Sequence, residues 1–257
     1  MKTLAALIIS STISLVSRGQ APSLKNWTID TLPTGDKIYS ANQSHNDWTF
    51  TDVSGKWEII QNSYSKEKGD VFPFSAAFID KNLKQLKANR FVKRTPDGYL
   101  VGLDKGEFGG GLYFVKPDGL DSYQITDYLN IRSIFEYEGR YFALEGLAHL
   151  GIQEGQIIEI IREDAIWKYK SLTRLIDAPA LIADYKDGKV IVTSQYILKF
   201  GGDLKVTQIL KSPFYWGMLY PSSLLIDNND LYLAMRQGVL KITSFDSKPE
   251  YIWYTPK

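Results

Sequence analysis

The chain has 257 residues and balances 30 Lys and Arg against 29 Asp and Glu, which leaves a net charge of +1. This balance gives no reason to expect nucleic acid or another strongly charged partner. The absence of cysteine excludes disulfides, thiolate metal sites and cysteine nucleophiles. The aromatic content of 13% favours β structure, because rings fit pleated, half-buried surfaces.

The N-terminus has the pattern of a secretory signal peptide. Lys2 precedes an apolar run over residues 4–16, and the small residues Ser17 and Gly19 follow it. The run is too short for the roughly 20 residues that a membrane-spanning helix needs. We therefore predict a signal peptide over residues 1–19, with a buried N-terminal helix or an uncleaved anchor as the alternatives.

This pattern predicts a location outside the cytoplasm. An exported chain without cysteine fits a bacterial secreted or periplasmic protein better than a eukaryotic one, whose secreted domains usually carry disulfides. No acylated N-terminal cysteine is available, so we expect no stable membrane anchor once the signal is cleaved.

From Lys37 onward, one unit recurs with variation. An apolar strand, a polar turn, a second and nearly continuous apolar strand, a gap and a third strand follow one another. Corresponding turns lie near residues 97, 138, 187 and 228. Two of them contain Asp-Gly, a hairpin signal because glycine accepts positive φ. A period of about 40–50 residues with several strands per unit is typical of a β-propeller.

The repeats resemble those of bacterial exported β-propeller proteins, most clearly at residues 187–193 and 237–242. We therefore predict an all-β fold in which residues 20–257 form a single propeller. It would have about five (five to six) blades of three to four antiparallel strands. A two-sheet sandwich or an irregular barrel is the alternative. The resemblance is generic and implies no catalytic residues.

The N-terminal part is less regular. Residues 47–52 and 56–60 predict a hairpin, and residues 61–70 predict a polar loop. Residues 78–86 could form a short helix or a turn. The aromatic tail at 251–254 reads as a strand that closes the ring against the N-terminal segment, since closure removes free sheet edges.

The glycine-rich segment 106–111 is the first candidate site. A strand-like run at 112–115 follows it, whereas a phosphate-binding loop would precede a helix. We expect a tight turn between strands. Asp104 or Glu107 could point from this turn into a ligand pocket.

His149 is the second candidate. Glu145 lies four positions before it, and the apolar residues between and after them suggest a loop packed on the core. His149 could be a hydrogen-bonded structural residue, or it could act in catalysis with Glu145 or Glu107. Nothing in the spacing of His149 and His45 supports a metal site, and no cofactor is indicated.

Alignment of the repeats gives a third candidate. Residues at the end of the middle strand should gather at one end of the ring and form a polar mouth; they are Asp104, Glu145, Ser194 and Arg236. The alternative is that exposed strand ends are simply polar. We expect Arg236 to pair with Asp104 or Glu145.

Trp216 and Tyr220, on a connection between blades, are the fourth candidate. They could form a stacking surface for a sugar or a peptide, or they could fill the core between blades.

These observations predict an exported, soluble binding module. It would recognise a small molecule, a glycan or a protein through Asp104, Glu145, Trp216, Tyr220 and Arg236. One alternative is a propeller enzyme, a lyase or hydrolase acting on a sugar, lactone or peptide, that uses His149. The other is a scaffold without a small-molecule site.

Overall fold

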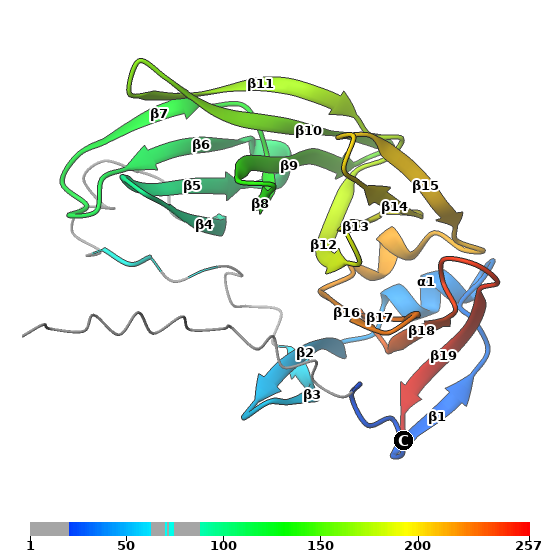
Figure 1. Ribbon diagram of the computed structural model, residues 1–257. Coiled ribbons are helices and arrows are strands. Elements are labelled where there is room, and N and C mark those ends of the chain that lie inside the picture. Colours follow the sequence, from blue (N-terminus) through cyan, green and yellow to red (C-terminus); the bar gives the residue numbers. More distant parts are fainter. Residues whose placement is uncertain (1–20, 63–69, 71, 75–87) are drawn as a thin grey trace, which may run out of the picture.

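The computed structural model describes residues 21–62, 70, 72–74 and 88–257. The predicted signal peptide, the predicted helix at 78–86 and most of the predicted loop at 61–70 lie outside these residues. The described residues form five antiparallel sheets that follow one another around a common axis, which confirms the all-β propeller (Figure 1).

Three sheets have four strands each. Blade I consists of β4 (Asn89–Thr95), β5 (Gly98–Asp104), β6 (Gly110–Val115) and β7 (Ser122–Thr126). Blade II consists of β8 (Ile131–Tyr137), β9 (Arg140–His149), β10 (Ile152–Glu163) and β11 (Ile166–Arg174). Blade III consists of β12 (Pro179–Tyr185), β13 (Gly188–Thr193), β14 (Tyr196–Phe200) and β15 (Val206–Lys211).

The last two sheets involve the N-terminal segment. Blade IV consists of β16 (Ser223–Asp227), β17 (Asp230–Ala234), β18 (Val239–Thr243) and β19 (Glu250–Pro256), with β1 (Trp27–Asp30) as a fifth strand. Blade V has two described strands, β2 (Asp47–Val53) and β3 (Lys56–Asn62). The predicted hairpin at 47–60 is thus confirmed.

The C-terminal strand pairs with the N-terminal segment, as the aromatic tail at 251–254 predicted. β1 pairs antiparallel with β19, from Trp27 opposite Pro256 to Asp30 opposite Trp253. The N-terminal segment therefore covers the outer edge of the sheet that the C-terminal strand would otherwise leave open. A short helix that was not predicted, α1 (Lys37–Asn42), follows β1.

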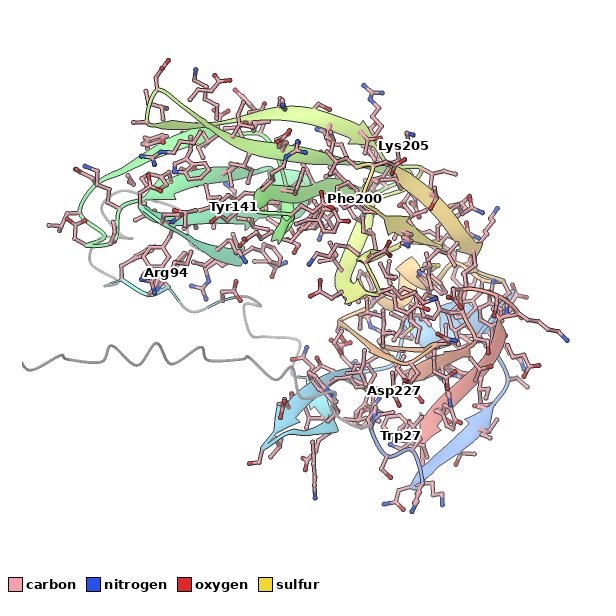
Figure 2. The ribbon with its side chains drawn as sticks, in the orientation of Figure 1. Trp27, Arg94, Tyr141, Phe200, Lys205 and Asp227 are labelled. Atoms are coloured by element: carbon pink, nitrogen blue, oxygen red, sulfur yellow. The ribbon has the colours of Figure 1, made fainter. Side chains whose placement is uncertain are left out.

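The middle strands are buried on both faces, as their continuous apolar sequence predicts. On β13, Val190 and Val192 pack into the cluster shared with blade IV, whereas Ile191 packs with Phe142 of blade II. Phe200 lies where blades II and III meet (Figure 2), with its ring centroid 5.5 Å from that of Phe142. The aromatic residues thus fill the spaces between neighbouring sheets.

The structure corrects the reason given for the Asp-Gly turns. Gly98 and Gly188 begin the second strand of their hairpins and do not have positive φ. A Cβ at Gly98 would lie 2.3 Å from the carbonyl oxygen of Val115, and one at Gly188 would lie 2.4 Å from that of Phe200. Glycine is needed there because the third strand comes close.

Candidate functional site

A cavity of about 700 Å³ lies at the end of the blades opposite the turns near residues 97, 138, 187 and 228. Blades I–III and the connection from blade III to blade IV line it. The inner strands β4, β8 and β12 and the loops after β9, β13 and β15 supply its walls. Leu150 and Tyr220 line it and are 91% and 52% exposed, so the cavity opens to solvent there.

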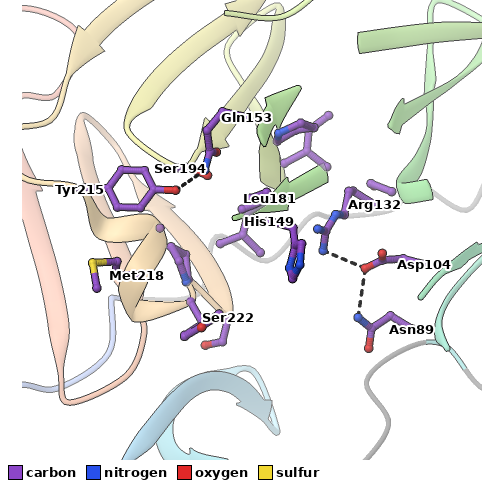
Figure 3. Close-up of a pocket in the computed structure, with 18 of the residues that line it drawn as sticks. Asn89, Asp104, Arg132, His149, Gln153, Leu181, Ser194, Tyr215, Met218 and Ser222 are labelled. Carbon is purple, nitrogen blue, oxygen red and sulfur yellow. Dashed lines mark hydrogen bonds and ion pairs between the residues drawn. The ribbon is translucent and has the colours of Figure 1, made fainter. Parts of the chain in front are cut away.

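Asp104 and Arg132 form the charged part of the wall (Figure 3). Arg132 Nη1 donates to Asp104 Oδ2 at 2.8 Å, and Asn89 Nδ2 donates to the same oxygen at 3.2 Å. The backbone N–H of Gly106 donates to Asp104 Oδ1 at 2.9 Å. Three donors therefore hold the buried carboxylate, and the carboxylate in turn fixes the guanidinium.

Arg132 is a cavity residue that was not predicted from the sequence, and a β-bulge places it there. Ile131 pairs with Glu145 and Ser133 pairs with Leu144, so Arg132 is the extra residue of β8. Such a bulge re-aims a side chain, here toward the propeller axis. Its Nε also donates to the carbonyl oxygen of Gly146 at 3.2 Å.

The glycine-rich segment forms the 3₁₀ turn η1 (Gly106–Phe108) between β5 and β6. Gly106 and Gly109 have φ of 60° and 81°, which favours glycine at both positions. A Cβ at Gly110 would lie 2.3 Å from the carbonyl oxygen of Leu103. The glycines are explained by the turn itself, and the turn presents Glu107 toward blade II.

His149 lines the cavity and contacts Glu107 of blade I, with 2.5 Å between Nε2 and Oε2. Of the two carboxylates that the sequence offered as its partner, Glu145 and Glu107, the contact is with Glu107. His149 ends the continuous strand β9, not a loop, and four residues of extended chain span about 13 Å. The carboxylate partner comes instead from the neighbouring blade.

Glu145 does not line the cavity among the described residues. Its Oε2 accepts a hydrogen bond from Gln156 Nε2 at 3.1 Å on the adjacent strand β10. Burial raises the pKa of the Glu145 carboxyl, although hydrogen bonds from Gln156 and the Asn130 backbone oppose the rise. Glu145 therefore links β9 to β10 within blade II through its hydrogen bond with Gln156.

The opposite side of the cavity is more apolar. Tyr215 and Met218 lie across it from Arg132, and Leu181 lies between the two sides (Figure 3). Gln153 Nε2 donates to the Tyr215 hydroxyl at 2.5 Å, which ties blade II to the connection between blades III and IV. Neither the apolar wall nor this contact was found from the sequence.

The structure separates the two predicted aromatic residues. Trp216 is fully buried and its Nε1 donates to the carbonyl oxygen of Thr193 at 2.7 Å, so it belongs to the core and offers no stacking surface. Tyr220 lines the cavity and has φ of 51°.

The expected partners of Arg236 are also corrected. Arg236 Nη1 donates to the backbone and side-chain oxygens of Asn42 at 2.5 and 2.6 Å, and its guanidinium lies 4.5 Å from the Tyr220 ring centroid. Burial lowers the pKa of Arg236, whereas the charge of Asp47 raises it. This arginine supports the cavity rim through Tyr220 and fastens α1 to blade IV.

Of the four aligned strand-end residues, therefore, Asp104 and Ser194 line the cavity, whereas Glu145 and Arg236 do not. Over the described part of the chain, no group of three or more His, Asp or Glu side chains is placed to hold a metal ion. Within the same residues, no helix is long and apolar enough to cross a membrane.

No family model and no curated protein matches the sequence. Among solved structures, the chain is similar to the extracellular domain of a putative hybrid two-component system from B. thetaiotaomicron, with 10% identity and a TM-score of 0.45. That match covers 80% of this chain but 27% of the other.

Two enzymes are also similar in structure. A thermostable family-43 glycoside hydrolase has 9% identity and a TM-score of 0.37 over 66% of this chain and 72% of the other. A catalytically inactive virginiamycin B lyase from Staphylococcus aureus, solved with quinupristin, has 12% identity and a TM-score of 0.41 over 90% and 81%. At such identities these likenesses assign no activity to this chain.

Proposed function

We propose that this protein is a binding module that takes a small molecule into the cavity at the mouth of the propeller. The observation that carries the proposal is the convergence of Arg132, His149 and Gln153 with an apolar wall in one cavity. Its volume of about 700 Å³ lies within the range of small-molecule sites, which combine an apolar lining with a few placed polar groups.

The concave shape favours a small molecule over a folded protein partner, which usually needs a broad surface of about 800 Å² on each side. It also favours a binding role over a scaffold without a site. Tyr220 leaves a stacking role open for a sugar ring at the entrance.

A thermal-shift screen of small molecules tests this function. A ligand that binds only the folded state raises the unfolding temperature. We expect Arg132→Met to weaken binding of every hit about tenfold or more, because it removes a charged hydrogen-bond donor. Arg140→Met is the matched control. Arg140 also pairs with a buried carboxylate of blade II, that of Glu159 at 2.6 Å, but does not line the cavity.

A second variant covers the case in which Arg132→Met folds poorly. Ala148 lines the cavity and is exposed, so Ala148→Trp should fill the space without disturbing the core. Loss of binding in Ala148→Trp with unchanged folding supports the site. Hits that bind equally to wild type, Arg132→Met and Ala148→Trp would place binding elsewhere and overturn the proposal.

A second candidate function is catalysis by His149, and the contact with Glu107 favours it specifically. A carboxylate that accepts the Nε2 proton fixes the imidazole and leaves Nδ1 able to exchange a proton with a bound molecule. Incubating each hit with the protein and recording its mass and chromatographic retention tests this role. A hydrolase changes the mass, a lyase that opens a ring changes the chromatographic retention at constant mass, and His149→Gln, which keeps a hydrogen-bond donor near Glu107, abolishes either change. Hits recovered unchanged argue for binding alone.

We further propose that the protein acts outside the cytoplasm, in a bacterial periplasm or as a secreted protein. The pattern of residues 1–19 supports this location. Mass spectrometry of the protein from an exported fraction should give a chain that begins near Gln20. An intact N-terminus on the mature, folded protein would contradict it.

A further inference from the structure

The geometry points to a neutral, amphipathic ligand, and this inference rests on the proposed binding function. We infer that a carbonyl or hydroxyl oxygen of the ligand accepts a hydrogen bond from Arg132 Nη2. The apolar part of the ligand lies against the wall around Leu181 and Met218. The class therefore includes amides, esters and lactones with a substantial hydrocarbon or aromatic portion.

Neutrality follows from the charges of the cavity. Apart from His149, Asp104 and Arg132 are the charged residues among the described ones that line it, and they neutralise each other at 2.8 Å. Asp104 is only 3% exposed, so water screens its charge poorly. An anion placed on Arg132 would face this carboxylate, and a cation beside Asp104 would face the guanidinium.

The His149–Glu107 contact gives an anion no advantage either. A protonated imidazole would be balanced by the Glu107 carboxylate at 2.5 Å, and a neutral imidazole would leave a net negative charge. In neither state does this pair add net positive charge to the cavity, and the amine of each matched series tests whether the Glu107 carboxylate attracts a cation.

Arg132 is prepared to bind an acceptor. Its Nη1 is held by Asp104 and its Nε by the carbonyl oxygen of Gly146. Within the described part of the chain, Nη2 donates to no protein acceptor. Two fixed atoms orient the planar guanidinium, so the ligand need not order this side chain when it binds.

Leu150 offers the apolar part of the ligand a contact at the entrance. It occupies the first position of a two-residue hairpin turn with φ of 47°, where Asn is strongly preferred, and it is 91% exposed. A leucine at this position is disfavoured by both its backbone and its solvation. An apolar ligand that covers Leu150 would remove this surface from water.

Matched compounds that share one body and differ in the terminal group test the inference. One series is phenylbutanamide, phenylbutanoate and phenylbutylamine; a second is decanamide, decanoate and decylamine. We expect the amide to bind about tenfold tighter than the acid and the amine of the same body, as measured by titration calorimetry. Arg132→Met should remove this preference, whereas Arg140→Met should keep it.

The outcomes distinguish failure of the neutral-ligand inference from failure of the proposed binding function. Tighter binding of the acid or the amine, or no binding of either amide, overturns the neutral ligand. If other hits of the screen are still lost in Ala148→Trp, the binding function survives that result. If no compound in the screen or the series binds, both proposals fail. An amide preference that persists in Arg132→Met overturns the role of Arg132.

Discussion

The two ends of the blades differ in how much they repeat. At the turn end, hairpins close after two residues, with Thr95 opposite Gly98 and Tyr185 opposite Gly188. At the cavity end, equivalent strand ends carry different residues: Asp104 binds Arg132, whereas Ser194 contacts the η2 (Trp216–Leu219) connection. The residues that recur at the turn end therefore serve packing, whereas the residues at the cavity end differ between blades and form the site.

The turn end gives the largest expected effect. Gly188→Ala places a Cβ 2.4 Å from the Phe200 carbonyl oxygen, so we expect the free energy of unfolding to fall by about 3 kcal/mol. Gly201→Ala is the control, because its Cβ would meet nothing closer than 3.9 Å. Denaturant titration measures both. Equal losses in the two variants would show that close packing does not explain the repeated glycine.

Trp216→Phe separates a structural residue from the ligand-facing ones at the cavity end. The change leaves a void and removes the donor to the Thr193 carbonyl, so unfolding should become easier by about 2 kcal/mol. Affinity for a cavity ligand should stay within about twofold of wild type. A large loss of affinity with little loss of stability would contradict this and show that Trp216 contacts the ligand.

Leu150→Asn should have a smaller and opposite effect on stability. Asn-Gly suits this turn, so we expect a gain of about 1 kcal/mol in the free energy of unfolding. Binding of the matched amides should weaken at the same time, because an apolar contact is lost. A variant that gains stability and keeps full affinity would deny Leu150 any part in the site.

Glu145→Gln should give the smallest effect, visible as a pH dependence. Burial raises the pKa of Glu145 above its value in the unfolded chain, so the protonated carboxyl favours the folded state. That contribution is complete below the unfolded pKa and is lost as pH rises through the folded one. Thermal melts should therefore show Glu145→Gln slightly more stable than wild type at neutral pH, with the difference shrinking in acid. A stability difference between the two proteins that stays constant from neutral to acidic pH would contradict a raised pKa of Glu145.

The fold could be predicted from the sequence because its signals are local and repeated. Turn residues and buried middle strands recur along the chain, and the aromatic tail indicated the closing strand β19. The site depends on features that a single sequence does not show. A bulge aims Arg132, and the meeting of two blades decides that His149 contacts Glu107 and not Glu145. Trp216 and Arg236 were misplaced because burial and partner choice depend on which segments meet.

Hydrogen exchange tests the central claim most directly, because it locates a bound molecule on one end or the other. With the tightest amide bound, protection should rise at the cavity end, in residues 104–109, 148–153 and 215–222. The turns near residues 97, 138, 187 and 228 should exchange as in the free protein. Protection confined to the turn end or to the outer strands would contradict a ligand site at the mouth of the propeller.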